Sequence, residues 1–125
     1  MMVYTGYYAK MKKYKELDLV PVSIAYGTPM WYDGETCFEV APPRKLLVKY
    51  KEGAINRNEY AKEYKDFLKT VKWSEVIEKL YTISDRYNES DLVLVCFEKS
   101  GDFCHRHLLA EYLTKNGLKV EECEV

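Results

Sequence analysis

The chain has 125 residues, of which 47% are hydrophobic and 31% charged, and its formal net charge at pH 7 is −1. A chain of this length can bury roughly two-thirds of its unfolded surface, so we expect a single domain spanning residues 1–125. No apolar run approaches the roughly 18 residues that a membrane span needs, and Met1–Lys15 is too polar for a secretory signal. These features exclude a membrane protein and favour a cytoplasmic location.

The N-terminal third predicts two strands separated by a short helical segment. Met2–Tyr8 is rich in β-branched and aromatic residues and predicts a strand, and Ala9–Glu16 predicts a Lys-rich turn or short helix. Leu19–Ala25 is almost continuously apolar, which is typical of a strand covered on both faces. Tyr26–Gly34 contains two glycines and one proline, and therefore predicts a loop.

The middle of the chain predicts three helices. Two prolines precede the first, over Arg44–Lys51. Either Asn56 or Asn58 can cap the second, and Ser74 is the candidate cap of a third that runs to Tyr87. Residues at helical spacing form the buried stripes of the last two helices: Tyr60, Tyr64, Phe67 and Leu68 in one, and Val76, Ile77, Leu80 and either Ile83 or Ser84 in the other.

The C-terminal third predicts the centre of the sheet. Asp91–Glu98 is an unbroken apolar run of the kind found in central parallel strands. A helix follows from about His105 and ends at Asn116–Gly117, and Leu118–Val125 can add an edge strand. The order of elements predicts an α/β fold, namely a three-layer sandwich with a small, mostly parallel sheet of about four strands flanked by helices.

In open parallel sheets, ligands bind beyond the carboxyl ends of the strands, where loops and helix N-termini converge. The first predicted strand ends near Tyr7, the second near Tyr26, and the third leads into Glu98–Arg106. We therefore expect the site to lie at this edge. The residues expected to bind the ligand are Tyr7, Tyr26, Gly27, Thr28, Trp31, Gly101 and Arg106.

The segment after the third strand carries the groups suited to chemistry. Gly101 allows close approach to the backbone, and the first amides of the following helix attract an anion. The helix dipole, adjacent Arg106 and a protonated His105 would lower the pKa of the Cys104 thiol and make it a nucleophile. In this interpretation His105 is a general acid or base, Arg106 clamps an anion, and Glu98 is its orienting carboxylate.

Each of these residues also has a purely structural interpretation. Cys104 can be a half-buried residue with no chemistry, and His105 can be a hydrogen-bonded residue beneath its helix. Arg106 can form an ion pair with Glu98 or Glu111 instead of binding a ligand. Whether the protein is an enzyme or only binds its ligand therefore stays open.

Three segments resemble the domain-of-unknown-function 488 (DUF488) family. The main one is an apolar strand ending in Cys-x-Glu, a loop, Cys-His-Arg and a helix, matched here by Cys96, Glu98 and Cys104–Arg106. The segment YTGYY resembles the family's first strand, and VSIAYGTPMWY resembles the second strand of a subgroup with a Gly-x-Pro-x-Trp loop. Many members carry Asp-Val-Arg at the end of that strand, where this chain has Ser23–Tyr26. The resemblance implies an α/β fold with a clustered polar site, and it implies no particular reaction.

The leading hypothesis is a strand-edge pocket for a small anionic ligand such as a nucleotide, with no cofactor. One alternative is a nucleic-acid-binding module that uses residues 42–72, which hold nine Lys/Arg against four Asp/Glu. A further alternative is a metal site at the Cys/His cluster. We expect no metal there, because the cluster lacks the CxxC or HxxxH spacing of zinc ligands.

Overall fold

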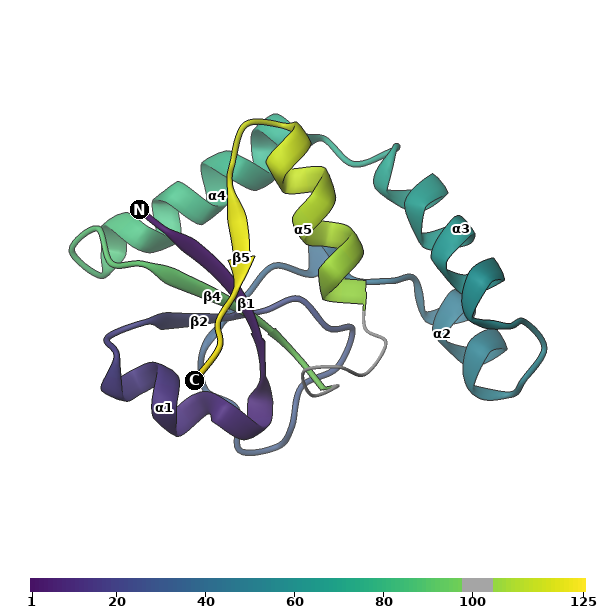
Figure 1. Cartoon of the computed structure of the whole chain (residues 1–125), viewed down its shortest axis with the longest axis horizontal. Helices are drawn as coiled ribbons and strands as arrows, with labels where there is room; N and C mark the ends of the chain where they lie inside the picture. Colours follow the sequence, from purple (N-terminus) through teal and green to yellow (C-terminus); the bar gives the residue numbers. More distant parts are fainter. Residues whose placement is uncertain (98–104) are drawn as a thin grey trace.

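The chain folds around one parallel sheet, shown in Figure 1. The structure is a computed structural model that describes residues 1–97 and 105–125. Within these residues the sheet has five strands in the order β3-β2-β4-β1-β5, and every pairing is parallel. The strands are β1 (Val3–Tyr7), β2 (Val20–Ser23), β3 (Glu35–Thr36), β4 (Leu92–Cys96) and β5 (Val120–Glu122).

Strand β4 occupies the centre of the sheet, as its unbroken apolar sequence predicted. All five of its residues are buried, and it pairs with β1 on one side and β2 on the other. Cys96 lies opposite Tyr7 at the end of β1, and Val95 lies opposite Ser23 at the end of β2. The carboxyl ends of the three strands therefore meet at one edge of the sheet.

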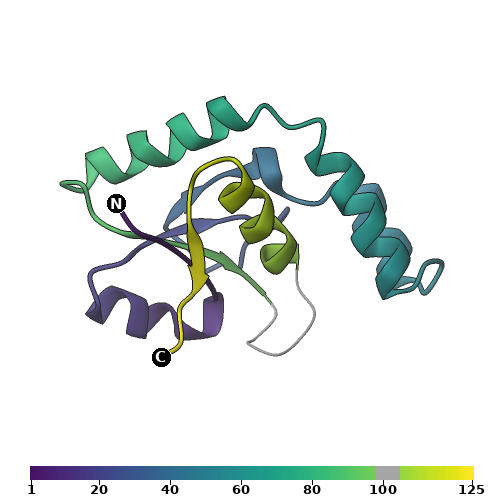
Figure 2. The same cartoon turned by 45° about the horizontal axis from the view of Figure 1, so that its top comes forward.

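Helices cover both faces of the sheet, which gives the predicted three layers (Figures 1 and 2). On one face, α1 buries Met11 and Tyr14 against Val93 and Val95 of β4. The opposite face of the sheet packs against the other helices, and α2 and α3 extend beyond the carboxyl edge of the strands. The helices are α1 (Met11–Glu16), α2 (Arg44–Lys51), α3 (Arg57–Leu68), α4 (Trp73–Arg86) and α5 (His105–Lys115), with short 3₁₀ turns η1 (Tyr8–Lys10) and η2 (Phe38–Val40).

The predicted elements correspond closely to the observed ones, apart from the short turn η2, one extra strand and the start of one helix. The sheet has five strands where about four were predicted, because the two-residue β3 gives too short a signal in the sequence. The prediction of Ser74 as the cap of α4 was wrong, since that helix already begins at Trp73. The indole N–H of Trp73 donates to the Leu68 carbonyl oxygen at 3.0 Å, which holds the start of α4 against the end of α3.

Asn56 is the N-cap of α3, and it forms a complete capping box with Glu59. This settles the choice between Asn56 and Asn58 that the sequence left open. Among the helices in the described ranges, none is both long and apolar enough to cross a lipid bilayer.

Candidate functional site

A cavity of about 420 Å³ lies at the carboxyl edge of the sheet, where the sequence predicted a ligand site. Its wall is assembled from the loop after β2, the end of β4, helices α2 and α3, and the start of α5. Several chain segments that are distant in sequence therefore converge on one hollow. The lining residues are Ala25, Tyr26, Gly27, Thr28, Pro42, Leu47, Tyr50, Lys51, Tyr60, Phe97 and His105.

Four of the predicted site residues come together in this cavity. Tyr26, Gly27 and Thr28 are exposed and follow β2, while His105 reaches the same space from the start of α5. A Cβ atom added at Gly27 would meet no atom within 4 Å, so the backbone at this position faces open space. The loop after β2 thus offers an exposed hydroxyl and an accessible stretch of backbone to a ligand.

Helices α2 and α3 supply cavity residues that the sequence reasoning missed. The rings of Tyr50 and Tyr60 lie 4.7 Å apart between centroids, with an interplanar angle of 38°. Lys51 is exposed at the end of α2 and is the only Lys or Arg among the described lining residues. The available signal was the placement of Tyr50 and Lys51 in a predicted helix just after two prolines, but the sequence does not show that this helix folds back over the strand edge.

His105 is buried, with 6% of its surface exposed, and contacts with two described residues help to fix its ring. Its Nε2 lies 2.8 Å from the Ile24 carbonyl oxygen, so the neutral ring donates its Nε2–H to the backbone. The ring also packs edge-on against Tyr64, at 5.5 Å between ring centroids. Burial lowers the pKa of His105 to about 4. The imidazole is therefore neutral at pH 7, so it does not supply the positive charge that was expected to lower the pKa of Cys104.

Arg106 is fully buried, and its guanidinium forms a two-point ion pair with Glu122 of β5. Its Nε donates to Oε1 of Glu122 at 3.1 Å, and its Nη2 donates to Oε2 at 2.9 Å. Its Nη1 also donates to the Cys96 sulfur at 3.1 Å, and the guanidinium carbon lies 5.6 Å from the centroid of the Tyr7 ring. Among the described residues, the carboxylate that pairs with Arg106 is thus Glu122, which the sequence did not single out.

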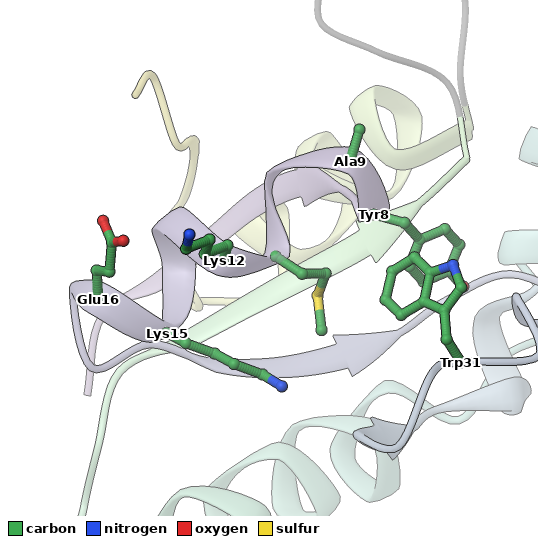
Figure 3. Close-up of a pocket in the computed structure, with 7 residues that line it drawn as sticks. Tyr8, Ala9, Lys12, Lys15, Glu16 and Trp31 are labelled. Carbon is green, nitrogen blue, oxygen red and sulfur yellow. The ribbon is translucent and has the colours of Figure 1, made fainter.

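Tyr7 and Trp31, which were expected to wall the pocket, lie elsewhere. Tyr7 lies beneath Arg106, and its backbone N–H donates to the Tyr14 hydroxyl at 3.1 Å. Trp31 is 60% exposed and borders a second hollow of about 680 Å³ beside α1, shown in Figure 3. Neither residue lines the cavity that contains His105.

Three predicted residues, Glu98, Gly101 and Cys104, lie outside the described residues. Their roles stay predictions, as does the catalytic role of the segment as a whole. In the described part of the chain, no group of three or more His, Cys, Asp or Glu side chains is arranged to hold a metal ion.

The fold and the cavity define a small parallel α/β protein with a ligand-sized hollow at the carboxyl edge of its sheet. Residues 19–117 match the family described as "Active DUF488-N3 subclade" (DUF488-N3a). The chain belongs to this DUF488 family, which confirms the resemblance seen in its sequence. Searches of the curated proteins and of the solved structures found no match.

Proposed function

We propose that this protein binds a small nucleotide-like ligand, with an aromatic ring and an anionic group, in the cavity at the carboxyl edge of the sheet. We further propose that it acts on that ligand through the Cys104–Arg106 segment. The observation that carries the proposal is the convergence of five separate chain segments on a single hollow at this edge.

The cavity wall matches the flat apolar part of such a ligand. Tyr50 and Tyr60 form an adjacent pair of rings on the side of α2 and α3. Phe97 and Tyr26 come from the strand side, and both are more than half exposed. A planar base entering the cavity would replace water on several aromatic surfaces, and stacking of this kind contributes roughly 1–3 kcal/mol per base.

The polar groups of the cavity suit the anionic part of the ligand. Lys51 provides a positive charge, and it takes part in none of the ion pairs found among the described residues. Thr28 adds a hydroxyl group, and the backbone near Gly27 is open to close approach. A phosphate or carboxylate is thus expected between the end of α2 and the loop after β2.

The proposed chemistry is divided among the three residues of the Cys-His-Arg motif. Cys104 is the proposed nucleophile when its thiol is reduced, and it directly precedes His105, which lines the cavity. His105 is a positioning residue, because its neutral ring is hydrogen-bonded to the Ile24 carbonyl oxygen. Arg106 positions the start of α5 through Glu122. The word "Active" in the family description supports a catalytic role for this chain.

The test is a calorimetric titration of the protein with the four ribonucleoside monophosphates, the matching nucleosides and inorganic phosphate. We expect at least one monophosphate to bind, and Lys51→Ala to weaken that binding about tenfold or more. Lys45→Ala is the matched control, since Lys45 is also exposed on α2 but does not line the cavity. Equal affinities in the two variants, or no binding by any monophosphate, would overturn the proposal.

Catalysis needs a separate measurement. Any turnover of a bound monophosphate is expected to disappear in Cys104→Ser, while the affinity of that ligand stays within about threefold. Full turnover in Cys104→Ser would remove the nucleophile assignment and leave the binding proposal intact.

A second candidate function, nucleic-acid binding by the face of residues 42–72, has one observation in its favour. Lys62, Lys65 and Lys69 of α3 and its C-cap border a shallow hollow with Tyr112. Two other observations count against it, since Lys49 pairs with Glu63 and Lys69 pairs with Asp66, which reduces the charge of this face. A double substitution of Lys62 and Lys65 to Ala would weaken nucleic-acid binding and reduce its salt dependence only if this face makes the phosphate contacts.

A further inference from the structure

The hollow beside α1 lies outside the cavity just described and has its own combination of groups. Its lining residues come from the η1–α1 segment and from Trp31 (Figure 3). Trp31 stands at one end beside Tyr8, and the Lys15 side chain extends toward that end. The charged ends of Lys12 and Glu16 lie at the opposite end. The hollow therefore combines an exposed aromatic surface with a nearby positive charge.

One aromatic residue joins this hollow to the cavity. The buried ring of Tyr8 packs edge-on against Trp31 at 6.2 Å and against Phe97 at 4.8 Å between centroids. Trp31 borders the hollow and Phe97 lines the cavity, so the two spaces share a wall centred on Tyr8. The ring centroids of Trp31 and Phe97 are therefore no farther apart than the sum of these two distances. A few stacked bases, spaced about 3.4 Å apart, cover such a separation.

The positioning of Tyr8 makes this shared wall rigid. Its hydroxyl lies 2.5 Å from the Ser23 hydroxyl at the end of β2, and Tyr32 packs edge-on against its ring at 5.4 Å. Trp31, in contrast, is 60% exposed although it is the largest aromatic side chain of the loop after β2. A fixed support beneath an exposed indole is the arrangement of a stacking platform for nucleobases.

The charges around Trp31 also favour an anionic ligand. Lys15 interacts with Asp33 at 3.7 Å, but both side chains are more than half exposed, so this pair is weak and can open. Among the described residues that line the hollow, Glu16 alone is acidic, and it lies at the end away from Trp31, near Lys13 at 4.0 Å. A phosphate placed beside Trp31 would thus meet Lys15, where it competes with the exposed Asp33 carboxylate for the ammonium group.

We propose that the hollow is a second subsite and that the natural ligand is a single-stranded oligonucleotide. This inference rests on the proposed function: one nucleotide occupies the cavity, its neighbour stacks on Trp31, and the phosphate beyond it lies near Lys15. The mononucleotide is then only part of the ligand, and binding across the Tyr8 wall accounts for two adjacent hollows at one edge of the sheet.

The test compares fluorescently labelled six-nucleotide oligoadenylate with adenosine monophosphate and the best-binding monophosphate. Trp31→Ala is expected to weaken oligonucleotide binding roughly tenfold or more, and to leave mononucleotide affinity within about twofold. Lys15→Ala is expected to weaken oligonucleotide binding and to lower its dependence on salt. Lys13→Ala is the matched control, because Lys13 is exposed on the same helix but does not line the hollow.

The outcomes separate this inference from the proposed function. Unchanged oligonucleotide affinity in Trp31→Ala, with mononucleotide binding still sensitive to Lys51→Ala, would overturn the second subsite alone. Oligonucleotide and mononucleotide binding that are both insensitive to Lys51→Ala would overturn the proposed function. A thermal unfolding midpoint for Trp31→Ala within a few degrees of the unsubstituted protein checks that the variant is folded.

Discussion

Arg106 and Glu122 form a two-point ion pair that joins the first turn of α5 to the edge strand β5. The Arg106 side chain is fully buried, and that of Glu122 is 18% exposed. The Thr5 hydroxyl also donates to Oε1 of Glu122 at 2.6 Å, which adds β1 to the same group of contacts. This ion pair therefore fixes the helix start, and with it the position of His105 in the cavity wall.

Removing the negative charge of Glu122 should leave the buried Arg106 guanidinium without this ion pair. We expect Glu122→Gln to lower the free energy of unfolding by about 2–4 kcal/mol, measured by urea denaturation. Glu121→Gln is the control, since Glu121 is exposed and pairs with Lys119, and it should cost no more than about 0.5 kcal/mol. Similar losses in the two variants would mean that the ion pair does not hold α5.

The pH dependence of stability should reveal the buried, neutral His105. The pKa of the folded residue is about 4, against 6.5 for an ordinary histidine, because burial disfavours the imidazolium. Below about pH 6.5 the unfolded chain gains a proton that the folded chain does not, so acid favours unfolding. The contribution of neutral His105 to the free energy of unfolding is fully present above pH 6.5 and disappears as the pH falls toward 4.

We therefore expect the free energy of unfolding to fall by up to about 1.4 kcal/mol per pH unit between pH 6.5 and 4 because of His105. His105→Gln should remove this part of the slope, which urea denaturation at several pH values would measure. Burial also lowers the pKa of His107, so some slope should persist in the variant. An identical slope in both proteins would contradict the assignment of a buried neutral His105.

The end of β1 should accept no side chain at Gly6. A Cβ atom at this position would overlap the hydroxyl and ring of Tyr14, which sit directly above it. Tyr14 cannot move freely, because it is buried and its hydroxyl accepts the Tyr7 N–H. We expect Gly6→Ala to destabilise the protein by about 1–3 kcal/mol or more.

Gly27→Ala provides the comparison for Gly6→Ala, because the space around Gly27 is open. Its unfolding midpoint in urea should stay close to that of the unsubstituted protein. A large loss of stability in Gly27→Ala, or none in Gly6→Ala, would show that the backbone at these strand ends is packed differently.

The capping box at the start of α3 gives a direct contrast between two similar residues. The Asn56 side chain accepts from the Glu59 N–H at 2.8 Å, and the Glu59 carboxylate accepts from the Asn56 N–H at 3.0 Å. Asn56→Ala should cost about 0.5–2 kcal/mol of unfolding free energy, and Asn58→Ala clearly less. The measurement is the unfolding midpoint of each variant in urea. A midpoint for Asn56→Ala that is not below that of Asn58→Ala would contradict the prediction.

The sequence predicted most of the fold, because the signals for its main elements are local. The unbroken apolar run of β4 and the helical spacing of Tyr60, Tyr64 and Leu68 depend only on neighbouring residues, and both were confirmed. Strand β3 was not predicted, because two residues are too few to show the alternating pattern of a strand. The start of α4 was misplaced at Ser74 because the helix has no side-chain cap to signal its first residue: its N-cap is Lys72, whose side chain makes no capping hydrogen bond.

The site was predicted less completely than the fold, for a physical reason. The edge of the sheet follows from parallel strand order, and four residues expected there line one cavity: Tyr26, Gly27, Thr28 and His105. The partner of Arg106 depends on which edge strand covers it, and the contributions of Tyr50 and Lys51 depend on how α2 folds over the strand ends. Such long-range packing leaves no pattern in a single sequence.

The central claim is that the cavity at the carboxyl edge of the sheet holds the ligand. Its most direct test is an NMR titration of the ¹⁵N-labelled protein with the best-binding monophosphate. We predict that the largest shifts of the described residues fall on the amides of Ala25–Thr28, Lys51 and His105, which surround the cavity. Shifts concentrated instead on Lys62, Lys65 and Lys69 of the basic face, with the cavity amides unmoved, would contradict the claim.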